Sequence, residues 1–171
     1  MPMLLLGSQE NKIDQKNRIF LPSKFREPYG SDFVMSFDED RKCIKCLTTE
    51  NFINIYNSYN NGDDEIYLEK GAKLQRLIRN STTATIDNQG RTTIPSKWLE
   101  SMSVNGTALI VGMVNYFEIW GSDDYAEDDN NLKQAIKLAD RTERSTKKAN
   151  ALKDLAVAEA VIEENKKLIE D

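Results

Sequence analysis

Two short segments of the chain carry polar and basic side chains of the types that contact nucleic acid. The side chains at their tips are Gln15, Lys16 and Arg18 in the first segment and Asn88, Gln89 and Arg91 in the second. An arginine can hold a phosphate or a guanine by two parallel hydrogen bonds, and asparagine and glutamine can hold adenine in the same way. A lysine acts as a point charge toward phosphate. These residue types favour DNA binding at two places.

An aspartate lies four residues before each arginine, and this spacing leaves two interpretations open. In the first, Asp14 and Asp87 shape a tight turn while Arg18 and Arg91 point outward to a ligand. In the second, each aspartate and its arginine pair with one another and only pin an exposed turn. Both interpretations can hold in part.

The charge distribution bears on this choice more than the net charge does. The chain has a formal net charge of -5 and a pI near 5.0, which by itself argues against DNA, because phosphate affinity comes from Lys and Arg that release counterions. Residues 11–25, however, hold four basic residues against one acidic residue, and residues 73–98 hold five against one. Screening limits each charge to a reach of about 8 Å at physiological salt, so the local basic clusters matter more for phosphate binding than the net charge does.

Cys43 and Cys46 have the spacing of a redox or zinc pair. The chain holds no further cysteine and no histidine to complete four zinc ligands, and residues three apart on a strand face opposite sides. We therefore expect buried apolar side chains and no metal. Two cysteines also cannot form the disulfide framework of a small secreted domain, which favours a cytoplasmic location.

Other patterns that could support catalysis are weak. The acidic runs at residues 38–40 and 123–124 could bind a divalent cation, but such runs are more often solvated turns. No nucleophile–base pair or phosphate loop is recognisable, and histidine, the commonest general base near neutral pH, does not occur. The longest apolar run near the start, Met3–Leu6, is too short for a membrane span. We expect no enzyme, no cofactor, no small-molecule substrate and no membrane contact.

The elements that position the two tips are repeated. Residues 11–25 align with residues 84–98 at an offset of 73, and residues 44–47 align with residues 117–120 at the same offset. The identical pairs are Ile13 and Ile86, Asp14 and Asp87, Arg18 and Arg91, Pro22 and Pro95, Ser23 and Ser96, and Lys24 and Lys97. A local repeat of this kind indicates a duplicated structural unit.

Each copy is expected to run as strand, tight turn, strand and short helix. The residues expected to shape the turns are Asp14 and Asn17 in the first copy and Asp87 and Gly90 in the second. Aspartate can bond the backbone two residues on, and Gly or Asn tolerates a positive φ. The strand after each turn ends at Pro22 or Pro95, because proline suits the start of a helix and cannot continue a central strand.

The remaining segments complete the predicted organisation. A further hairpin is expected in each copy, from residues 33–37 with 43–47 and from residues 107–113 with 116–120, and helical spacing covers residues 49–59 and 65–79. The predicted domains are a first repeat at 5–60, a connecting helix at 61–80, a second repeat at 81–126, and a helical or partly disordered tail at 127–171. Leu155, Ile162 and Ile169 recur every seven residues in this tail, a weak coiled-coil signal that indicates either a helix in contact with a protein or a frayed polar helix.

The doubled pattern of Asp, then Asn or Gly, then Arg, an apolar strand and Pro-Ser-Lys-aromatic resembles the MraZ family of transcriptional regulators, whose relatives include AbrB- and MazE-like swapped-hairpin barrels. The run Phe-Glu-Ile-Trp at residues 117–120 is also similar to that family. The resemblance covers about residues 5–125. The first copy has Asn17 where the family usually has Gly, and the chain continues beyond about residue 126 further than expected of the family.

The resemblance implies a fold, an assembly and a target. The fold is α+β and mainly β, a duplicated double-split (swapped-hairpin) β barrel with short flanking helices and a C-terminal helical tail. The assembly is a ring-like homo-oligomer. The target is double-stranded DNA at repeated promoter elements of the cell division and cell wall gene cluster, so that the protein acts at the nucleoid. The alternative is an antitoxin-type module, in which the barrel serves oligomerisation and the tail holds a protein partner.

Overall fold

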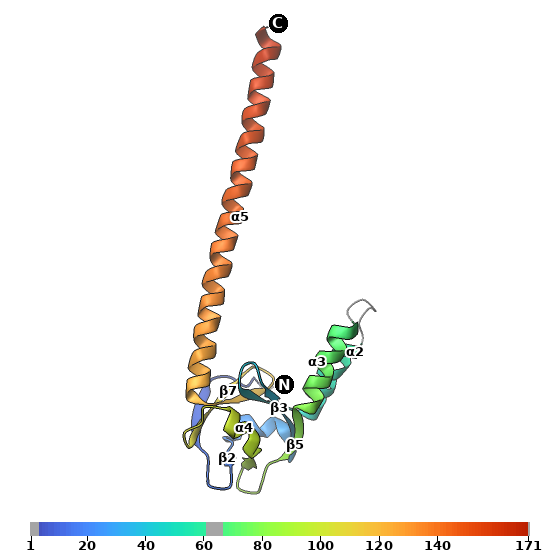
Figure 1. The fold of residues 1–171 in the computed structure, drawn as a ribbon, viewed down its shortest axis with the longest axis vertical. Helices are drawn as coiled ribbons and strands as arrows, with labels where there is room; N and C mark the ends of the chain where they lie inside the picture. The colour runs from blue at the N-terminus through green and yellow to red at the C-terminus, as the bar shows by residue number, and fades with distance from the viewer. Residues whose placement is uncertain (1–3, 61–66, 171) are drawn as a thin grey trace. The chain divides into compact units, whose positions relative to one another are not determined.

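The described part of the chain combines a β-rich region with one long helix. A computed structural model describes residues 4–60 and 67–170, and the side chains of residues 4–59 and 71–159. The chain divides into two units, Met1–Glu127 and Asp128–Asp171. Its strands are β1 (Ser8–Lys12), β2 (Arg18–Phe20), β3 (Asp32–Asp38), β4 (Cys43–Leu47), β5 (Ser81–Thr85), β6 (Arg91–Thr93), β7 (Thr107–Gly112) and β8 (Phe117–Trp120) (Figure 1). Its helices are α1 (Ser23–Arg26), η1 (Glu27–Tyr29), α2 (Thr49–Asn60), α3 (Tyr67–Arg79), α4 (Ser96–Ser101) and α5 (Ser122–Glu170).

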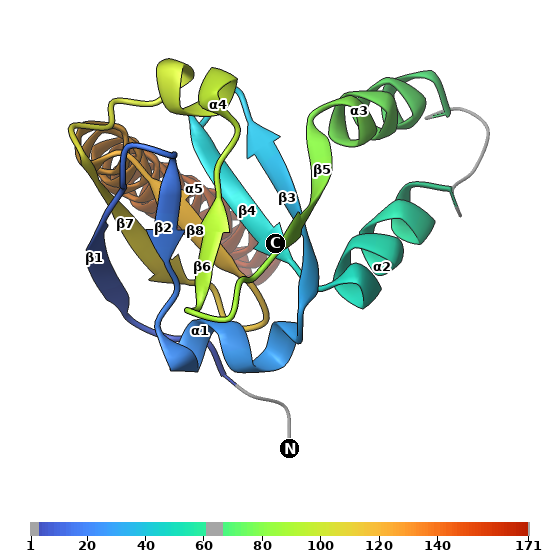
Figure 2. The same ribbon diagram turned by 90° about the horizontal axis from the view of Figure 1, so that it is seen from below.

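The strands form one six-stranded antiparallel sheet and one two-stranded ribbon. The order in the large sheet is β1-β7-β8-β4-β3-β5, and the ribbon pairs β2 with β6. Figure 2 shows the ribbon lying across one face of the large sheet, with α1 near one end of it and α4 near the other. The two hairpins predicted from the sequence are confirmed, because β3 pairs with β4 and β7 pairs with β8.

The order of the strands is symmetric with respect to the repeat. At the offset of 73, β1 corresponds to β5, β2 to β6, β3 to β7 and β4 to β8. Exchanging the two copies leaves the order of the sheet unchanged, with β4 and β8 paired at its centre. At the same offset, the first residue of α2, Thr49, corresponds to the first residue of α5, Ser122. The two copies are therefore related by an internal twofold arrangement.

The strands on the two sides of each predicted turn lie in different sheets. β1 pairs with β7, and β2 pairs with β6. The two strands that flank the first turn, β1 and β2, are joined to one another by an isolated bridge between Ile13 and Ile19. In the same way β5 pairs with β3 of the first copy. Each copy thus contributes strands to the other. Among the described residues β1 and β5 are the two edges of the large sheet, and no ladder joins them to close a barrel.

The hydrophobic core lies between the ribbon and the large sheet. Ile19, Leu21 and Ile94 from the ribbon strands and their ends are fully buried. They join a cluster in which the rings of Phe25, Tyr29, Phe33 and Phe117 contact one another. The Tyr29 ring lies 5.1 Å from the Phe117 ring, and its hydroxyl donates to the carbonyl of Cys46 at 2.8 Å. Such edge-on packing fixes the α1–η1 segment, and with it the ribbon, against the sheet.

The helices follow the predicted segments closely. α2 and α3 fall on the two segments with helical spacing, while residues 61–66 lie outside the described part. α1 and α4 begin directly after Pro22 and Pro95, which adopt φ values of -57° and -55°. The prediction of a mainly β protein is wrong for the chain as a whole, since α5 alone has 49 residues. No Gly or Pro interrupts it, so the strong helix formers of the tail extend without a break.

Candidate nucleic-acid interface

The first turn is built by hydrogen bonds to one aspartate. Oδ1 of Asp14 accepts the backbone N–H of Lys16 at 2.9 Å and that of Arg18 at 3.0 Å. The backbone carbonyl of Asp14 accepts the N–H of Asn17 at 2.9 Å, and its N–H donates to the carbonyl of Arg18 at 3.0 Å. Asn17 adopts a φ of 60°, the left-handed conformation that asparagine tolerates better than most residues. Four hydrogen bonds within residues 14–18 therefore fix the backbone of the turn, and the carboxylate of Asp14 accepts two of them.

The second turn repeats these contacts. Oδ1 of Asp87 accepts the N–H groups of Gln89 and Arg91, both at 2.9 Å. The N–H of Gly90 donates to the carbonyl of Asp87 at 2.8 Å, and Gly90 has a φ of 76°. Asparagine at position 17 and glycine at position 90 thus take up the same backbone conformation. The two turns present their tips in the same local geometry.

Each arginine pairs with the aspartate of its own turn. Nε and Nη2 of Arg18 lie 2.8 and 2.7 Å from Oδ2 of Asp14, and Nε and Nη2 of Arg91 lie 2.9 and 2.8 Å from Oδ2 of Asp87. The hydrogen bond from the arginine side chain is the main cause that lowers the pKa of Asp14 to about 2 and also lowers that of Asp87. The aspartates are therefore ionised at neutral pH.

The pairing leaves part of each guanidinium available. Two of its five N–H groups face the aspartate, so the edge that carries Nη1 can still donate to a ligand. The side chains of Arg18 and Arg91 keep 28% and 27% of their surface exposed. The aspartate also fixes the plane of the guanidinium, which reduces the entropy lost when a ligand is bound. The arrangement contains features of both interpretations of these residues: the pair pins the turn, and one edge of the arginine stays accessible.

The four remaining tip residues are exposed. They are Gln15, Lys16, Asn88 and Gln89. Within the described part of the chain their side chains make no hydrogen bond or ion pair, while the backbone N–H groups of Lys16 and Gln89 are held by the aspartates. Flexible polar side chains thus project from rigid backbone, which is an arrangement suited to contacting a surface.

The ribbon places both turns on one face of the molecule. The N–H of Leu21 donates to the carbonyl of Gly90 at 2.8 Å, and the N–H of Ile94 donates to the carbonyl of Asn17, also at 2.8 Å. Each turn is therefore bonded to the strand end of the other copy, and Figure 2 shows the turns at opposite ends of the ribbon. The repeat indicated that the two copies are equivalent, and the resemblance to swapped-hairpin barrels implied that they exchange strands. Neither gave the particular residues that pair.

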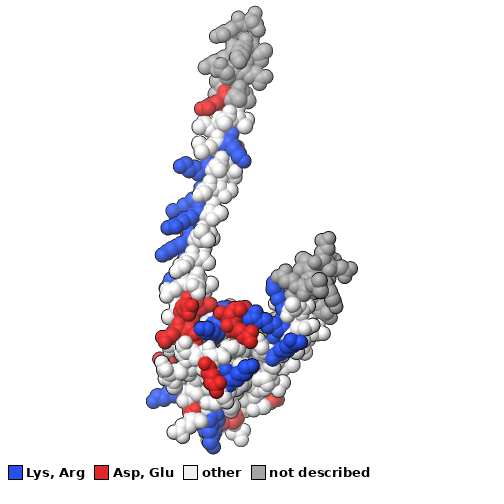
Figure 3. All heavy atoms as spheres, in the orientation of Figure 1, with Lys and Arg blue, Asp and Glu red and all other residues white. Residues whose placement is uncertain are grey.

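The basic cluster predicted over residues 73–98 does not form one surface. Nη1 and Nη2 of Arg76 both donate to the carboxylate of Asp40 at 2.9 Å, and Arg76 also pairs with Glu39. This arginine therefore neutralises the β3–β4 turn instead of adding to the second tip. Figure 3 shows acidic and basic side chains mixed over the face of the β-rich unit that it displays.

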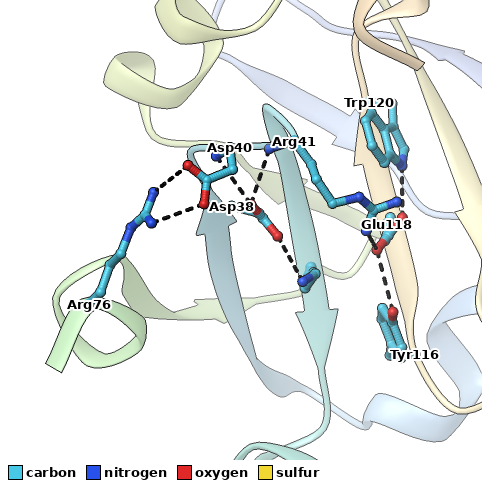
Figure 4. Close-up of polar contacts among 8 residues, drawn as sticks. Asp38, Asp40, Arg41, Arg76, Tyr116, Glu118 and Trp120 are labelled. Carbon is cyan, nitrogen blue, oxygen red and sulfur yellow. Dashed lines mark hydrogen bonds and ion pairs between the residues drawn. The ribbon is translucent and has the colours of Figure 1, made fainter. Parts of the chain in front are cut away.

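The acidic run at residues 38–40 is engaged by the protein's own cations. Burial raises the pKa of Asp38, but hydrogen bonds from Nζ of Lys45 at 2.9 Å and from the backbone of Arg41 outweigh it, so that the pKa lies below its ordinary value (Figure 4). Within the described residues no group of three acidic or cysteine side chains could hold a metal ion. Cys43 and Cys46 are buried free thiols in β4.

A buried acid that sequence reasoning did not single out lies beside this region. Glu118 in β8 is 1% exposed, and Figure 4 shows Arg41, Tyr116 and Trp120 around its carboxylate. The sequence contained one signal for it, a glutamate within an otherwise apolar strand. A buried carboxylate needs a cation or several hydrogen-bond donors, so this glutamate predicts such partners nearby. The contacts are internal, so Glu118 supports the fold and takes no direct part in the candidate interface.

The fold and the two turns define a class of protein: an internally duplicated β structure in which exchanged strands hold a pair of equivalent Asp–Arg turns on one face. A family model described as "MraZ protein, putative antitoxin-like" matches residues 77–149. The chain is 30% identical over 125 residues to the transcriptional regulator MraZ of Mycoplasmopsis pulmonis (strain UAB CTIP), covering 72% of this chain and 82% of the relative. It is 28% identical over 123 residues to that of Cutibacterium acnes (strain DSM 16379 / KPA171202), covering 71% and 84%.

The chain belongs to the MraZ family. The family match ends at residue 149, well inside α5, whereas the resemblance seen in the sequence ended at about residue 125. The matched relatives carry the name of a transcriptional regulator, which is not a class of enzyme. None of the helices in the described ranges is both long and apolar enough to cross a membrane.

Proposed function

We propose that the protein regulates transcription by binding double-stranded DNA through its two Asp–Arg turns. The observation that carries this proposal is their equivalence: two turns with the same hydrogen bonds and exposed polar tips lie at opposite ends of one short ribbon. The ribbon has three residue pairs and spans roughly 10 Å at about 3.4 Å per residue. This length is comparable with the major groove, which is about 12 Å wide.

Each tip residue has a role that follows from its chemistry. The free edges of Arg18 and Arg91 bind guanine or phosphate, and Lys16 binds phosphate. The amide side chains at the tips read base edges, adenine above all, and they are Gln15, Asn88 and Gln89. Asp14, Asn17, Asp87 and Gly90 shape the turns and do not touch the DNA. Since Asn17 and Gly90 share one conformation, both turns contribute to binding.

The finer fold and the assembly are part of the same proposal. The exchange of strands between the copies supports a double-split, swapped-hairpin barrel made within one chain, with the ribbon as its crossing element. One protomer with two small tips neutralises few phosphates, so we infer that the protein binds as a homo-oligomer, of ring-like form, in which several protomers engage repeated sites. Linked sites of this kind can raise affinity by roughly 10² to 10⁴.

The proposed target rests on the resemblance to the family. We propose repeated promoter elements of the cell division and cell wall gene cluster as the binding sites, and hence action in the cytoplasm at the nucleoid. The description of the matched family model as antitoxin-like supports one alternative, a module that holds a protein partner. A stoichiometric protein that copurifies with the chain and abolishes DNA binding would favour that alternative.

Fluorescence anisotropy with duplex DNA from the gene's own upstream region tests the proposal. The tip variant carries Gln15→Ala, Lys16→Ala, Asn88→Ala and Gln89→Ala, which removes exposed side chains and leaves both turns bonded. A matched control carries Asn54→Ala, Asn57→Ala, Gln75→Ala and Arg79→Ala, four exposed positions on α2 and α3 with the same change in charge. We expect the tip variant to lose at least about tenfold in affinity and the control to bind as the wild type does.

A second variant tests whether binding requires the arginines at all. Arg18→Ala/Arg91→Ala should abolish specific binding and reduce the dependence of affinity on salt, while circular dichroism and sedimentation confirm that it remains folded and assembled. Equal binding by the wild type, the tip variant and the arginine variant would assign the arginines to pinning the turns alone and would refute the proposed site.

A further inference from the structure

The tail helix α5 carries a row of basic side chains that the turns do not explain. Lys137, Arg141, Arg144 and Lys148 are separated by four, three and four residues, and all four are exposed. Figure 3 shows lysine and arginine side chains projecting along one side of this helix. We call these four residues the basic stripe.

Helix geometry places the stripe on a single face. At 3.6 residues per turn the four residues fall within roughly 60° of one another, and they extend for about 16 Å along the helix at 1.5 Å per residue. The acidic residues in the same segment, Asp140 and Glu143, fall outside this arc. The face is therefore continuously positive over about three helical turns.

The ion pairs of this helix lie outside the stripe. Lys147 pairs with Glu143 at 2.7 Å, and Lys133 pairs with Asp129. None of the four stripe residues forms an ion pair with any residue that the structure describes. Each stripe residue also has a like charge three or four positions away, which destabilises an isolated helix, and Asp140 is the one acidic residue of the segment at that spacing from a stripe residue. An exposed helix usually carries opposite charges four residues apart, as in the two ion pairs. The stripe instead carries charges of one sign.

The stripe is not an apolar contact surface. The exposed apolar residues of this segment, Leu132, Ile136 and Leu138, lie at other angles around the helix. A membrane-surface or coiled-coil helix needs its apolar residues on one face. The complementary partner is therefore a regularly charged anion that requires no apolar contact.

We propose that the basic stripe binds the phosphate backbone of double-stranded DNA. This inference rests on the proposed function and adds to it a second contact, one that does not depend on sequence. A strand of duplex presents a phosphate about every 3.4 Å along its axis, so the length of the stripe matches about five phosphates. The turns supply base recognition and the stripe supplies affinity, since phosphate contacts position a protein but carry no sequence information.

A pair of matched variants of the full chain tests the inference. Arg141→Gln/Arg144→Gln removes two charges from the stripe, and Lys147→Gln/Lys153→Gln removes two charges from elsewhere on α5. Glutamine keeps the helix propensity of the residues that it replaces. Affinity is measured as a function of salt for the upstream duplex and for an unrelated duplex of equal length. The oligomeric state of each variant is measured by sedimentation.

We expect the stripe variant to weaken binding to both duplexes by a similar factor and to reduce the slope of log K against log salt by about 2, as expected for two lost phosphate contacts. The control variant should change neither. Equal behaviour of the two variants, while the wild type still binds DNA, would overturn the inference and leave the proposed function standing. A stripe variant with a smaller oligomer would assign the stripe to another copy of the chain and overturn the inference. A wild type that binds neither duplex would overturn the proposed function as well.

Discussion

The guanidinium of Arg41 donates to the buried carboxylate of Glu118, with Nη1 lying 2.9 Å from Oε1 (Figure 4). Arg41 belongs to the β3–β4 turn of the first copy and Glu118 to β8 of the second. The Arg41 guanidinium also lies 4.8 Å from the ring centre of Trp120, whose indole N–H donates to Oε2 of Glu118 at 3.0 Å. The two copies are thus joined by a charged contact as well as by strand pairing.

Removing the cation from this contact should be strongly destabilising. Arg41→Leu leaves the carboxylate of Glu118 buried without its ion pair, and we expect a loss of about 3 kcal/mol in the free energy of unfolding. Urea denaturation at neutral pH measures it. Arg41→Leu/Glu118→Gln should recover part of the loss, because the buried charge is gone while the hydrogen bond from Trp120 remains. A surface control, Arg76→Leu, should have a small effect, since Arg76 and its partners are exposed. An equally small effect of Arg41→Leu would contradict this account.

The two turns should make stability depend on pH in the acid range. The pKa of Asp14 is lowered to about 2 from 3.8, and that of Asp87 is also lowered, in both cases chiefly by the arginine of the same turn. A lowered pKa means that the ionised carboxylate contributes stability that is complete above about pH 4 and is lost as the pH falls toward 2. Thermal unfolding of the wild type and of Asp14→Asn/Asp87→Asn should differ at pH 7 and converge near pH 2. A difference of constant size across this range would show that the charge is not the cause.

The centre of the ribbon contains a buried hydroxyl whose replacement should increase the stability of the protein. Thr92 is 2% exposed, and its hydroxyl makes no hydrogen bond with the described residues. Its strand partner, Ile19, is the apolar residue at the corresponding position of the first copy. We expect Thr92→Val to raise the free energy of unfolding by about 1 kcal/mol. Thr93→Val, at the exposed neighbouring position, should not raise it. A lower stability of Thr92→Val would indicate that the hydroxyl is satisfied in solution.

The two cysteines should be chemically inert in the folded protein. Cys43 and Cys46 are both fully buried, and burial raises the pKa of each thiol. Because the thiolate is the reactive form, alkylation at pH 8 followed by mass spectrometry should detect no labelling under native conditions and complete labelling in urea. An added exposed thiol, Ser145→Cys in α5, should react rapidly and serves as the internal control. Rapid labelling of Cys43 or Cys46 in the folded protein would contradict this prediction and favour a redox role for the pair.

The local features of the site could be predicted from the sequence. A repeat at constant offset is visible without a structure, and the Asp–Arg turn depends on hydrogen bonds between residues at most four apart. The short helices after Pro22 and Pro95 and the two later hairpins are also local. Each of these elements is decided by neighbours in the chain, so residue type and spacing contain enough information to place it.

The partners of the strands were decided only by the tertiary structure. Alternation of polar and apolar residues tells which face of a strand is buried, but it does not tell which strand lies beside it. Whether β2 pairs with β1 or with β6 depends on how the two copies bury the apolar residues Ile19 and Ile94 together. The pairing of charges was also decided by the tertiary structure. Arg76 belonged to a basic cluster in the sequence, but it forms an ion pair with Asp40, which lies 36 positions away. Sequence therefore determined the chemistry of the two turns, and packing between the copies determined that both turns share one face.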